Sequence, residues 1–261
     1  MALGYEVADG IATVTFDRPD VLNAFDDELG HAVLAAVTKA SDDESVRCLV
    51  LTGAGRAFSS GEDLGALADG YARGEVAPLG SVLVDRYNPL IRAITLAPKP
   101  VLAALNGVAA GAGASIALAC DFRIASEKAK LVLAFIKVGL VPDSGGIWFL
   151  TKMVGAAKAW ELCALGDPLS AEQALELHLV NRVVPADEFD GAWRSFAAKL
   201  ASGPTRAFAL TKRLQRAALE SPLDEQLELE GELQAEAGRS RDHLEGVRAF
   251  LGKRAPEFEG R

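Results

Sequence analysis

A chain of 261 residues, of which 50% are hydrophobic and 24% charged, can bury a core and has the composition of a globular protein. Its formal net charge of −9 argues against a protein that coats nucleic acid or an anionic membrane, although a phosphate-bearing small molecule needs only a local basic patch. Its three cysteines are scattered and form no Cys-x-x-Cys pair, so we predict neither a disulfide framework nor a metal site, and we expect a reducing cytoplasm.

Two segments bear on targeting and membrane insertion. The first ten residues lack a basic stretch followed by an apolar one, so no signal peptide is expected. Residues 101–120 carry no charge and are long enough to span a bilayer, but Asn106, Gly107, Gly111 and Gly113 interrupt them. We therefore interpret this segment as a buried strand, a glycine turn and a core helix.

The N-terminal third predicts a hairpin followed by a helix. Residues 5–7 and 11–16 have strand character and are joined by an Ala-Asp-Gly turn. Asp26 and Asp27 then open a helix on which Leu29, Val33 and Val37 share one face.

The middle of the chain alternates strands with helices. Strands are predicted at 47–52, 100–105, 122–125 and 131–133, and a glycine turn separates the second of them from a helix over 112–120. A second amphipathic helix is indicated by one apolar stripe, comprising Leu83, Tyr87, Leu90, Ile91 and Ile94. This alternation predicts an α/β core.

Beyond about residue 185 the pattern is helical alone. Helices are predicted over 186–201, 205–219, 222–237 and 242–253, separated by Ser-Gly-Pro at 202–204 and Ser-Pro at 221–222. We divide the chain into an α/β core with the binding site, residues 1–195, and a helical region for oligomerisation, residues 196–261.

Glycines directly follow two apolar strands, in CLVLTGAGRAFSSGEDL (48–64) and VLAALNGVAAGAGASIALACD (101–121). Each begins like a dinucleotide fingerprint, but Phe58 and Ile116 stand where the third glycine belongs, and no Lys-Ser/Thr follows. Such turns can instead present backbone N–H groups to a developing negative charge, and Ala112 at the start of its helix is placed for that role. The alternative is that the glycines only permit close strand-to-helix packing.

Six blocks in order show that the chain resembles the crotonase (enoyl-CoA hydratase/isomerase) superfamily over essentially its full length. They are DRPDVLNAFDDEL (17–29), LTGAGRAFSSGEDL (51–64), KPVLAALNGVAAGAGASIALACDFRIAS (99–126), GLVPDSGG (139–146), GDPLSAEQALELHLVNRVV (166–184) and GVRAFLGKRAPEF (246–258). The resemblance implies a ClpP-like β-β-α spiral core, with C-terminal helices that assemble homotrimers or hexamers. It also implies an acyl-CoA thioester substrate, whose coenzyme A is part of the substrate and not a separate cofactor.

The resemblance also assigns site residues. It implies that Ser60 and Ala112 donate their N–H groups to the thioester oxygen. Beside the coenzyme A moiety it places the turn Ser60, Gly61, Glu62 and Asp63 and the backbone around Asn23 and Ala24, and it carries Phe250 and Lys253 to a neighbouring subunit's ligand.

The residues for proton transfer depart from the hydratase pattern. Family hydratases use two glutamates, but Ser115 and Phe135 occupy those positions here. Asp143 is an alternative base if an apolar lining from Phe135, Ile136, Val138 and Leu140 raises its pKa, although Pro-Asp is also a common turn.

We therefore favour an acyl-CoA isomerase over a hydratase or lyase of the same fold. Local sequence looks most like the phenylacetate branch of the family, which includes 1,2-epoxyphenylacetyl-CoA isomerases that also shift enoyl double bonds. A non-catalytic acyl-CoA-binding protein is a third possibility, and a nicotinamide enzyme is the outlier.

Overall fold

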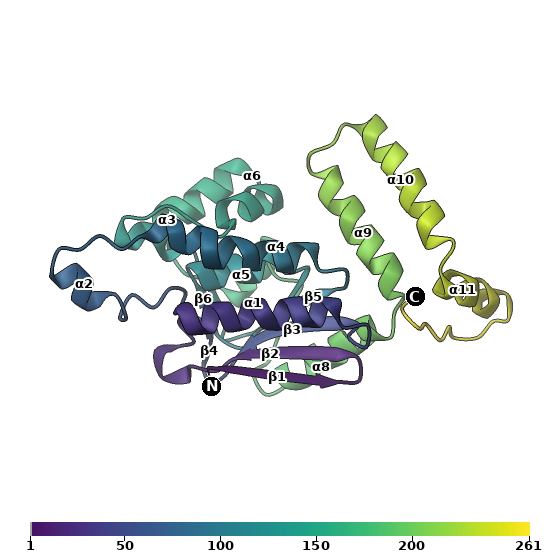
Figure 1. Ribbon diagram of the computed structural model, residues 1–261, viewed down its shortest axis with the longest axis horizontal. Coiled ribbons are helices and arrows are strands. Elements are labelled where there is room, and N and C mark those ends of the chain that lie inside the picture. The colour runs from purple at the N-terminus through teal and green to yellow at the C-terminus, as the bar shows by residue number, and fades with distance from the viewer. Residues whose placement is uncertain (1) are drawn as a thin grey trace.

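The computed structural model describes residues 2–261, and its core is built on two β-sheets (Figure 1). The larger sheet has the order β1-β2-β3-β5-β7-β10, and β1 and β2 form its only antiparallel pair among the described residues. Its strands are β1 (Leu3–Ala8), β2 (Ile11–Phe16), β3 (Cys48–Gly53), β5 (Val101–Leu105), β7 (Phe122–Ser126) and β10 (Arg182–Val184).

The strands of the smaller sheet alternate with those of the larger one along the chain. Its order is β4 (Ala57–Ser59), β6 (Val108–Ala110), β8 (Lys130–Val132) and β9 (Leu169–Ser170). The strands β3, β5 and β7 of the large sheet are each followed by one strand of the small sheet, so the chain winds as a spiral of paired strands and helices. The predicted β-β-α spiral is confirmed.

The N-terminal hairpin and the first helix form where local sequence predicts them. Asp9 and Gly10 both have positive φ, which suits a tight turn, and the inward-facing residues of β2 are fully buried. The helix α1 (Asp27–Asp42) begins after Asp26, whose carboxylate accepts a hydrogen bond from Leu29 N at 2.8 Å.

The second predicted helix forms and contains a π-helical turn. It consists of α3 (Leu79–Val82), a π-helical turn η2 (Leu83–Tyr87) and α4 (Asn88–Leu96), preceded by the short α2 (Ala68–Ala72). The wider π turn rotates the side chains that follow it, and such turns often occur at functional sites. Here it carries Arg86 and Tyr87 into the interior, where both are buried.

The uncharged segment 101–120 forms β5, β6 and α5 (Ala112–Ala119), a helix buried at every residue. Among the helices of residues 2–261, none is both long and apolar enough to cross a bilayer. Sequence periodicity does not predict α6 (Gly146–Leu165), because its apolar residues do not gather on one face; Gly155, with φ 77°, divides it by a kink. Three other short elements complete the core. They are the 3-10 turns η1 (Pro19–Val21) and η3 (Ala134–Val138) and the helix α7 (Ala171–Glu176).

Helices cover both faces of the large sheet (Figure 1). The helices α1, α4 and α5 lie over one face, and α8 (Phe189–Ala201) packs a second apolar cluster against the other. The predicted boundary at 195/196 falls inside α8, whose buried face runs on to Ala201. The region that leaves the core therefore begins after α8 and contains α9 (Thr205–Ala218), α10 (Leu223–Ala237) and α11 (Arg241–Leu251).

The C-terminal helices expose many large apolar side chains, which favours assembly. These are Leu223, Leu227, Leu244, Val247, Phe250 and Leu251, of which Phe250 is 83% exposed. We predict a trimeric or hexameric particle, measured by size-exclusion chromatography with light scattering. Replacing Phe250 and Leu251 together by serine should lower the mass of the particle, because the assembly dissociates. Val76→Ser, at a loop position 91% exposed, should leave that mass unchanged. A single-chain mass for the unaltered protein would contradict this prediction.

Candidate active site

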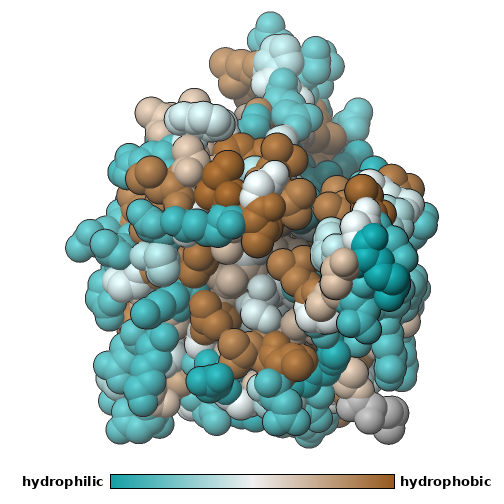
Figure 2. All heavy atoms as spheres, turned by 90° about the vertical axis from the view of Figure 1, so that its left-hand side faces the viewer, coloured by the Kyte–Doolittle hydropathy of each residue, from teal (hydrophilic) through white to brown (hydrophobic). Residues whose placement is uncertain are grey.

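A cavity of about 140 Å³ lies at the N-terminal end of α5. Its lining is mostly apolar and comes from four parts of the chain: the turn after β4, the segment from α3 to Tyr87, the start of α5 and the segment from η3 to Asp143. Among its lining residues are Leu64, Leu79, Val82, Leu83, Ala134, Phe135, Val138 and Leu140. On the face of the molecule where α2 and α3 lie, hydrophobic side chains gather around a hollow (Figure 2).

The two glycine-rich bends meet at this cavity. The parallel pairing of β4 with β6 brings Gly61 against the first turn of α5. A Cβ at Gly61, which has φ +90°, would lie 2.8 Å from Ala110 O and 3.2 Å from Ala112 N. One residue deeper, a Cβ at Gly113 would lie 2.8 Å from the carbonyl oxygen of Ser59. Glycine is therefore required on both sides of the contact.

The amide donors differ from those expected. Ser60 lines the cavity, but its N–H donates to Leu22 O at 2.9 Å, and its hydroxyl donates to Val21 O at 3.2 Å. The assignment of Ser60 as a donor to the ligand is therefore corrected. Its amide already has an acceptor within the fold.

The amide of Glu62, two residues later, is a candidate donor. Phe25 and Glu62 form a β-bridge in which Phe25 N donates to Gly61 O and Asp63 N donates to Phe25 O. This pattern leaves the N–H of Glu62 without an acceptor in residues 2–261. Ala112 N, at the first position of α5, has none there either. Two N–H groups thus border one cavity, and the helix dipole of α5 favours negative charge there.

The carboxylate of Glu62 is held by two buried side chains. It accepts a hydrogen bond from Tyr87 OH at 2.6 Å and pairs with Arg86, whose other terminal nitrogen lies 2.9 Å from Asp27 Oδ1. Burial alone would lower the pKa of Arg86, but the hydrogen bond and charge of Glu62 raise it above its ordinary value. Burial, reinforced by Glu62, also raises the pKa of Tyr87. Neither side chain therefore loses its proton readily.

Asp143 is the second carboxylate on the cavity, and it forms no ion pair with any residue of 2–261. Its Oδ1 accepts the Ser144 hydroxyl at 2.8 Å, and its backbone carbonyl accepts the Ser115 hydroxyl at 2.9 Å. Burial raises the pKa of Asp143 above its ordinary value, and the hydrogen bond from Ser144 offsets part of that rise. Ser115, which stands at one hydratase glutamate position, thus anchors the Asp143 turn.

The apolar surroundings expected for Asp143 are largely present. Phe135, Val138 and Leu140 line the same cavity. Ile136 does not, because its side chain turns toward Gly166. Phe135 stands at the other hydratase glutamate position and is buried, so neither position carries a carboxylate.

The loop around Asn23 supports the site from behind. The Asn23 amide donates to Ala54 O and Ala57 O at 2.9 and 2.7 Å, and Ser59 Oγ donates to Asn23 O. Arg18 donates to Ala24 O at 2.6 Å and pairs with Asp63 at 3.0 Å. The side chains of Asn23 and Asp63 are therefore engaged within the protein, and any contact of this loop with coenzyme A would come from its remaining groups.

Phe250 and Lys253 do not line the cavity of their own chain. Phe250 lies on α11 and Lys253 lies two residues beyond its end, at the opposite end of the molecule from α2 and α3 (Figure 1). Their contact with the ligand of a neighbouring subunit stays a prediction.

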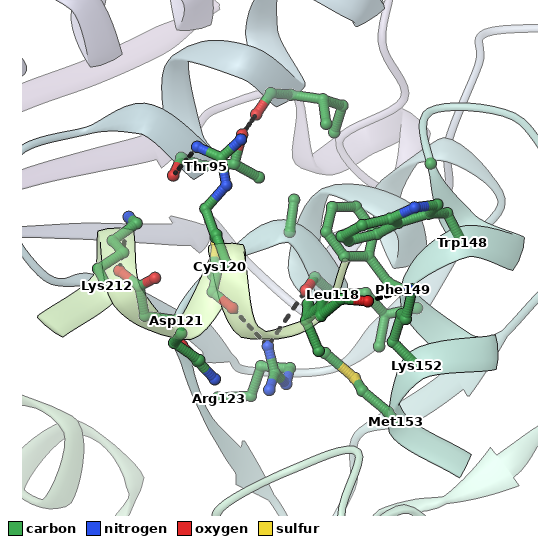
Figure 3. A pocket seen from close by; sticks show the side chains of 16 residues that line it. Thr95, Leu118, Cys120, Asp121, Arg123, Trp148, Phe149, Lys152, Met153 and Lys212 are labelled. Carbon is green, nitrogen blue, oxygen red and sulfur yellow. Dashed lines mark hydrogen bonds and ion pairs between the residues drawn. The ribbon is translucent and has the colours of Figure 1, made fainter. Parts of the chain in front are cut away.

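A second cavity, of about 360 Å³, lies at the other end of α5 between α6 and α9 (Figure 3). Its buried charges are already paired: Lys212 with Asp121 at 2.8 Å, and Arg123 with the backbone carbonyl of Cys120 at 2.6 Å. Arg123 thereby caps the carbonyl end of α5. The N-terminal end of the helix remains the better place for an anionic ligand atom.

Comparisons with known proteins identify the family of the chain. The sequence profile "Enoyl-CoA hydratase/isomerase" matches residues 6–261. The chain is 47% identical to a probable enoyl-CoA hydratase of Rhodobacter capsulatus, over 98% of this chain and 97% of that protein. It is 46% identical to the 1,2-epoxyphenylacetyl-CoA isomerase of Escherichia coli K12, with the same coverage. A crystal structure of a putative enoyl-CoA hydratase/isomerase from Mycobacterium abscessus superimposes with a TM-score of 0.92 at 37% identity, covering all of both chains.

The contact at Gly113 gives a test of the site's framework. Gly113→Ala should lower the free energy of unfolding by about 1–3 kcal/mol, because the new methyl group collides with the backbone of Ser59. The matched control Gly231→Ala, in open space on α10, should leave stability unchanged or raise it by up to about 1 kcal/mol. Denaturant unfolding of both variants measures the difference, and equal stabilities would show that the contact is not tight.

Proposed function

The chain belongs to the enoyl-CoA hydratase/isomerase family, and from that premise we propose that it is an acyl-CoA isomerase acting through a thioester enolate. In this scheme the amides of Glu62 and Ala112 bind the thioester oxygen and Asp143 transfers the proton. The observation that carries the assignment is the difference between the two carboxylates on the cavity. Glu62 is held by Arg86 and Tyr87, whereas Asp143 forms no ion pair within the described part of the chain.

The chemistry requires one base and one anion site. When Asp143 takes a proton from the carbon next to the thioester carbonyl, the electron pair moves onto the carbonyl oxygen. Two preorganised amides stabilise that charge, and removing one such donor typically costs about 3–4 kcal/mol of transition-state stabilisation. Returning the proton two carbons further along shifts the double bond, so the acid and base can be the same carboxyl group. No separate cofactor enters the scheme, because coenzyme A is part of the substrate.

A hydratase is the second candidate, because the relative from Rhodobacter capsulatus carries that name at 47% identity. Hydration needs one group to activate water and another to protonate the adjacent carbon. Ser115 and Phe135 provide neither at the two glutamate positions. Glu62 is the other carboxylate on the cavity, but its engagement by Arg86 and Tyr87 makes it a poor proton shuttle.

Ring-epoxide isomerisation is an alternative reaction for the same isomerase site, since the Escherichia coli relative at 46% identity is named for it. We place coenzyme A along the turn from Ser60 to Asp63 and the backbone near Asn23 and Ala24. Phe250 and Lys253 of an adjacent subunit are proposed to complete that site in a cytoplasmic trimer or hexamer.

Asp143→Asn tests the assignment of the base. The unaltered protein should shift the double bond of an enoyl-CoA in D₂O, with deuterium entering the substrate and no added mass of water. Asp143→Asn should reduce turnover at least about 1,000-fold, because the amide cannot accept the proton, while the Kd for the coenzyme A ester stays within a few-fold. The matched control Asp167→Asn, at an exposed ion pair with Lys137, should retain activity. Full activity of Asp143→Asn would refute the role of this carboxylate, and a product heavier by one water would favour the hydratase.

The raised pKa of Asp143 predicts a shifted pH profile. Because the base must be ionised, kcat/KM should fall as the pH drops through the pKa of Asp143, above the range of an ordinary aspartate. Ser144→Ala removes the hydrogen bond that lowers this pKa, so the acidic limb should move to higher pH. A limb that moves to lower pH in Ser144→Ala would contradict the identity of the titrating group.

A further inference from the structure

A buried guanidinium lies behind the proposed anion site and contacts none of the amides that form it. Arg86 is 2% exposed, and its two terminal nitrogens reach Glu62 and Asp27 on separate segments. Its position depends on Gly30, where a Cβ would lie 2.2 Å from the Arg86 side chain. The guanidinium also lies over the Tyr87 ring, 4.7 Å from its centroid. The fold thus makes room for this one cation beside the cavity.

The charge of Glu62 creates a problem that this cation can solve. The amide of Glu62 is proposed to donate a hydrogen bond to the negatively charged oxygen of the substrate. The same residue carries a carboxylate, and Glu62 borders the cavity. An uncompensated carboxylate there would repel the enolate oxygen, and low solvent exposure would strengthen the repulsion. Glu62 is 24% exposed, so water screens it only in part.

We propose that Arg86 is a positioning residue for the reaction, an inference that rests on the proposed isomerase function. It neutralises the Glu62 carboxylate and holds it against Tyr87, so that this residue offers the cavity its backbone N–H and not its negative charge. Asp27 receives the second arm of the guanidinium and fixes its orientation from an exposed position, its own side chain being 85% exposed.

The same cation acts on the proposed base. The groups that influence Asp143 are the Ser144 hydroxyl, the Glu62 carboxylate and the Arg86 guanidinium, and Asp143 in turn acts on Tyr87. Arg86 lowers the pKa of Asp143, and Glu62 raises it. Removing the charge of Arg86 should therefore move the acidic limb of the pH–rate profile upward, and removing that of Glu62 should move it downward. A purely structural role would not produce opposite shifts.

Four variants separate these effects, each measured for kcat, KM and the pH dependence of enoyl-CoA isomerisation. Arg86→Gln should reduce kcat about 10- to 100-fold, leave KM within a few-fold and move the acidic limb upward, because the Glu62 charge is then unpaired. Glu62→Gln should move the limb downward. The double variant should recover most of the lost kcat, and Arg86→Lys should retain more activity than Arg86→Gln. The control Arg73→Gln, at an exposed ion pair with Glu75, should match the unaltered protein.

The outcomes are distinct. An Arg86→Gln variant that folds and keeps its kcat and pH profile would overturn the inference, as would a double variant no better than Arg86→Gln. If Arg86→Gln does not fold, the acidic limb of Glu62→Gln decides the matter. The inference is overturned if that limb does not move to lower pH. The proposed function fails separately: an unaltered protein without isomerase activity, or an active Asp143→Asn, refutes the function and with it the role of Arg86.

Discussion

The parallel pairing of β4 with β6 is the contact on which the site depends. It seats Gly61 against the first turn of α5, and glycines on both sides allow backbone to touch backbone without intervening side chains. The bridge between Phe25 and Glu62 then uses the neighbouring amides and leaves the Glu62 N–H without an acceptor in residues 2–261, beside a cavity that Ala112 also lines. In the proposed site the donors are therefore main-chain groups, and their placement depends on the backbone and not on the side chains at positions 62 and 112.

The two carboxylates on the cavity differ in their electrostatic surroundings. Glu62 is paired with Arg86 and accepts from Tyr87, whereas Asp143 has only a hydroxyl donor and an apolar lining. Carboxylates with such different hydrogen-bond and ion-pair partners are suited to different roles. The π-helical turn ending at Tyr87 matters here because it places both partners of Glu62 inside the fold. Catalytic assignment therefore follows from neighbours, and residue type alone does not determine it.

Local sequence predicts much of the fold, and less of the site. The hairpin, α1 with its Asp26 cap and the buried α5 follow from turn chemistry and periodicity, and Ala112 and Asp143 were placed on the cavity by motif position. Ser60 was the wrong donor, because its amide is taken by Leu22, 38 positions earlier, through a loop contact that no local pattern encodes. The burial of Arg86 does not follow from the sequence either: helical spacing places it beside the apolar stripe, but a charged side chain there is usually solvated, and only the π turn and Gly30 reveal its burial.

The central claim is that two backbone amides share one thioester oxygen beside Asp143. A crystal structure with a non-reactive acyl-CoA analogue that keeps its carbonyl group tests this most directly. The account predicts that the carbonyl oxygen lies within hydrogen-bonding distance, about 2.7–3.2 Å, of both Glu62 N and Ala112 N, with the adjacent carbon facing the Asp143 carboxylate. An oxygen bound elsewhere, or an Asp143 turned away from that carbon, would contradict it.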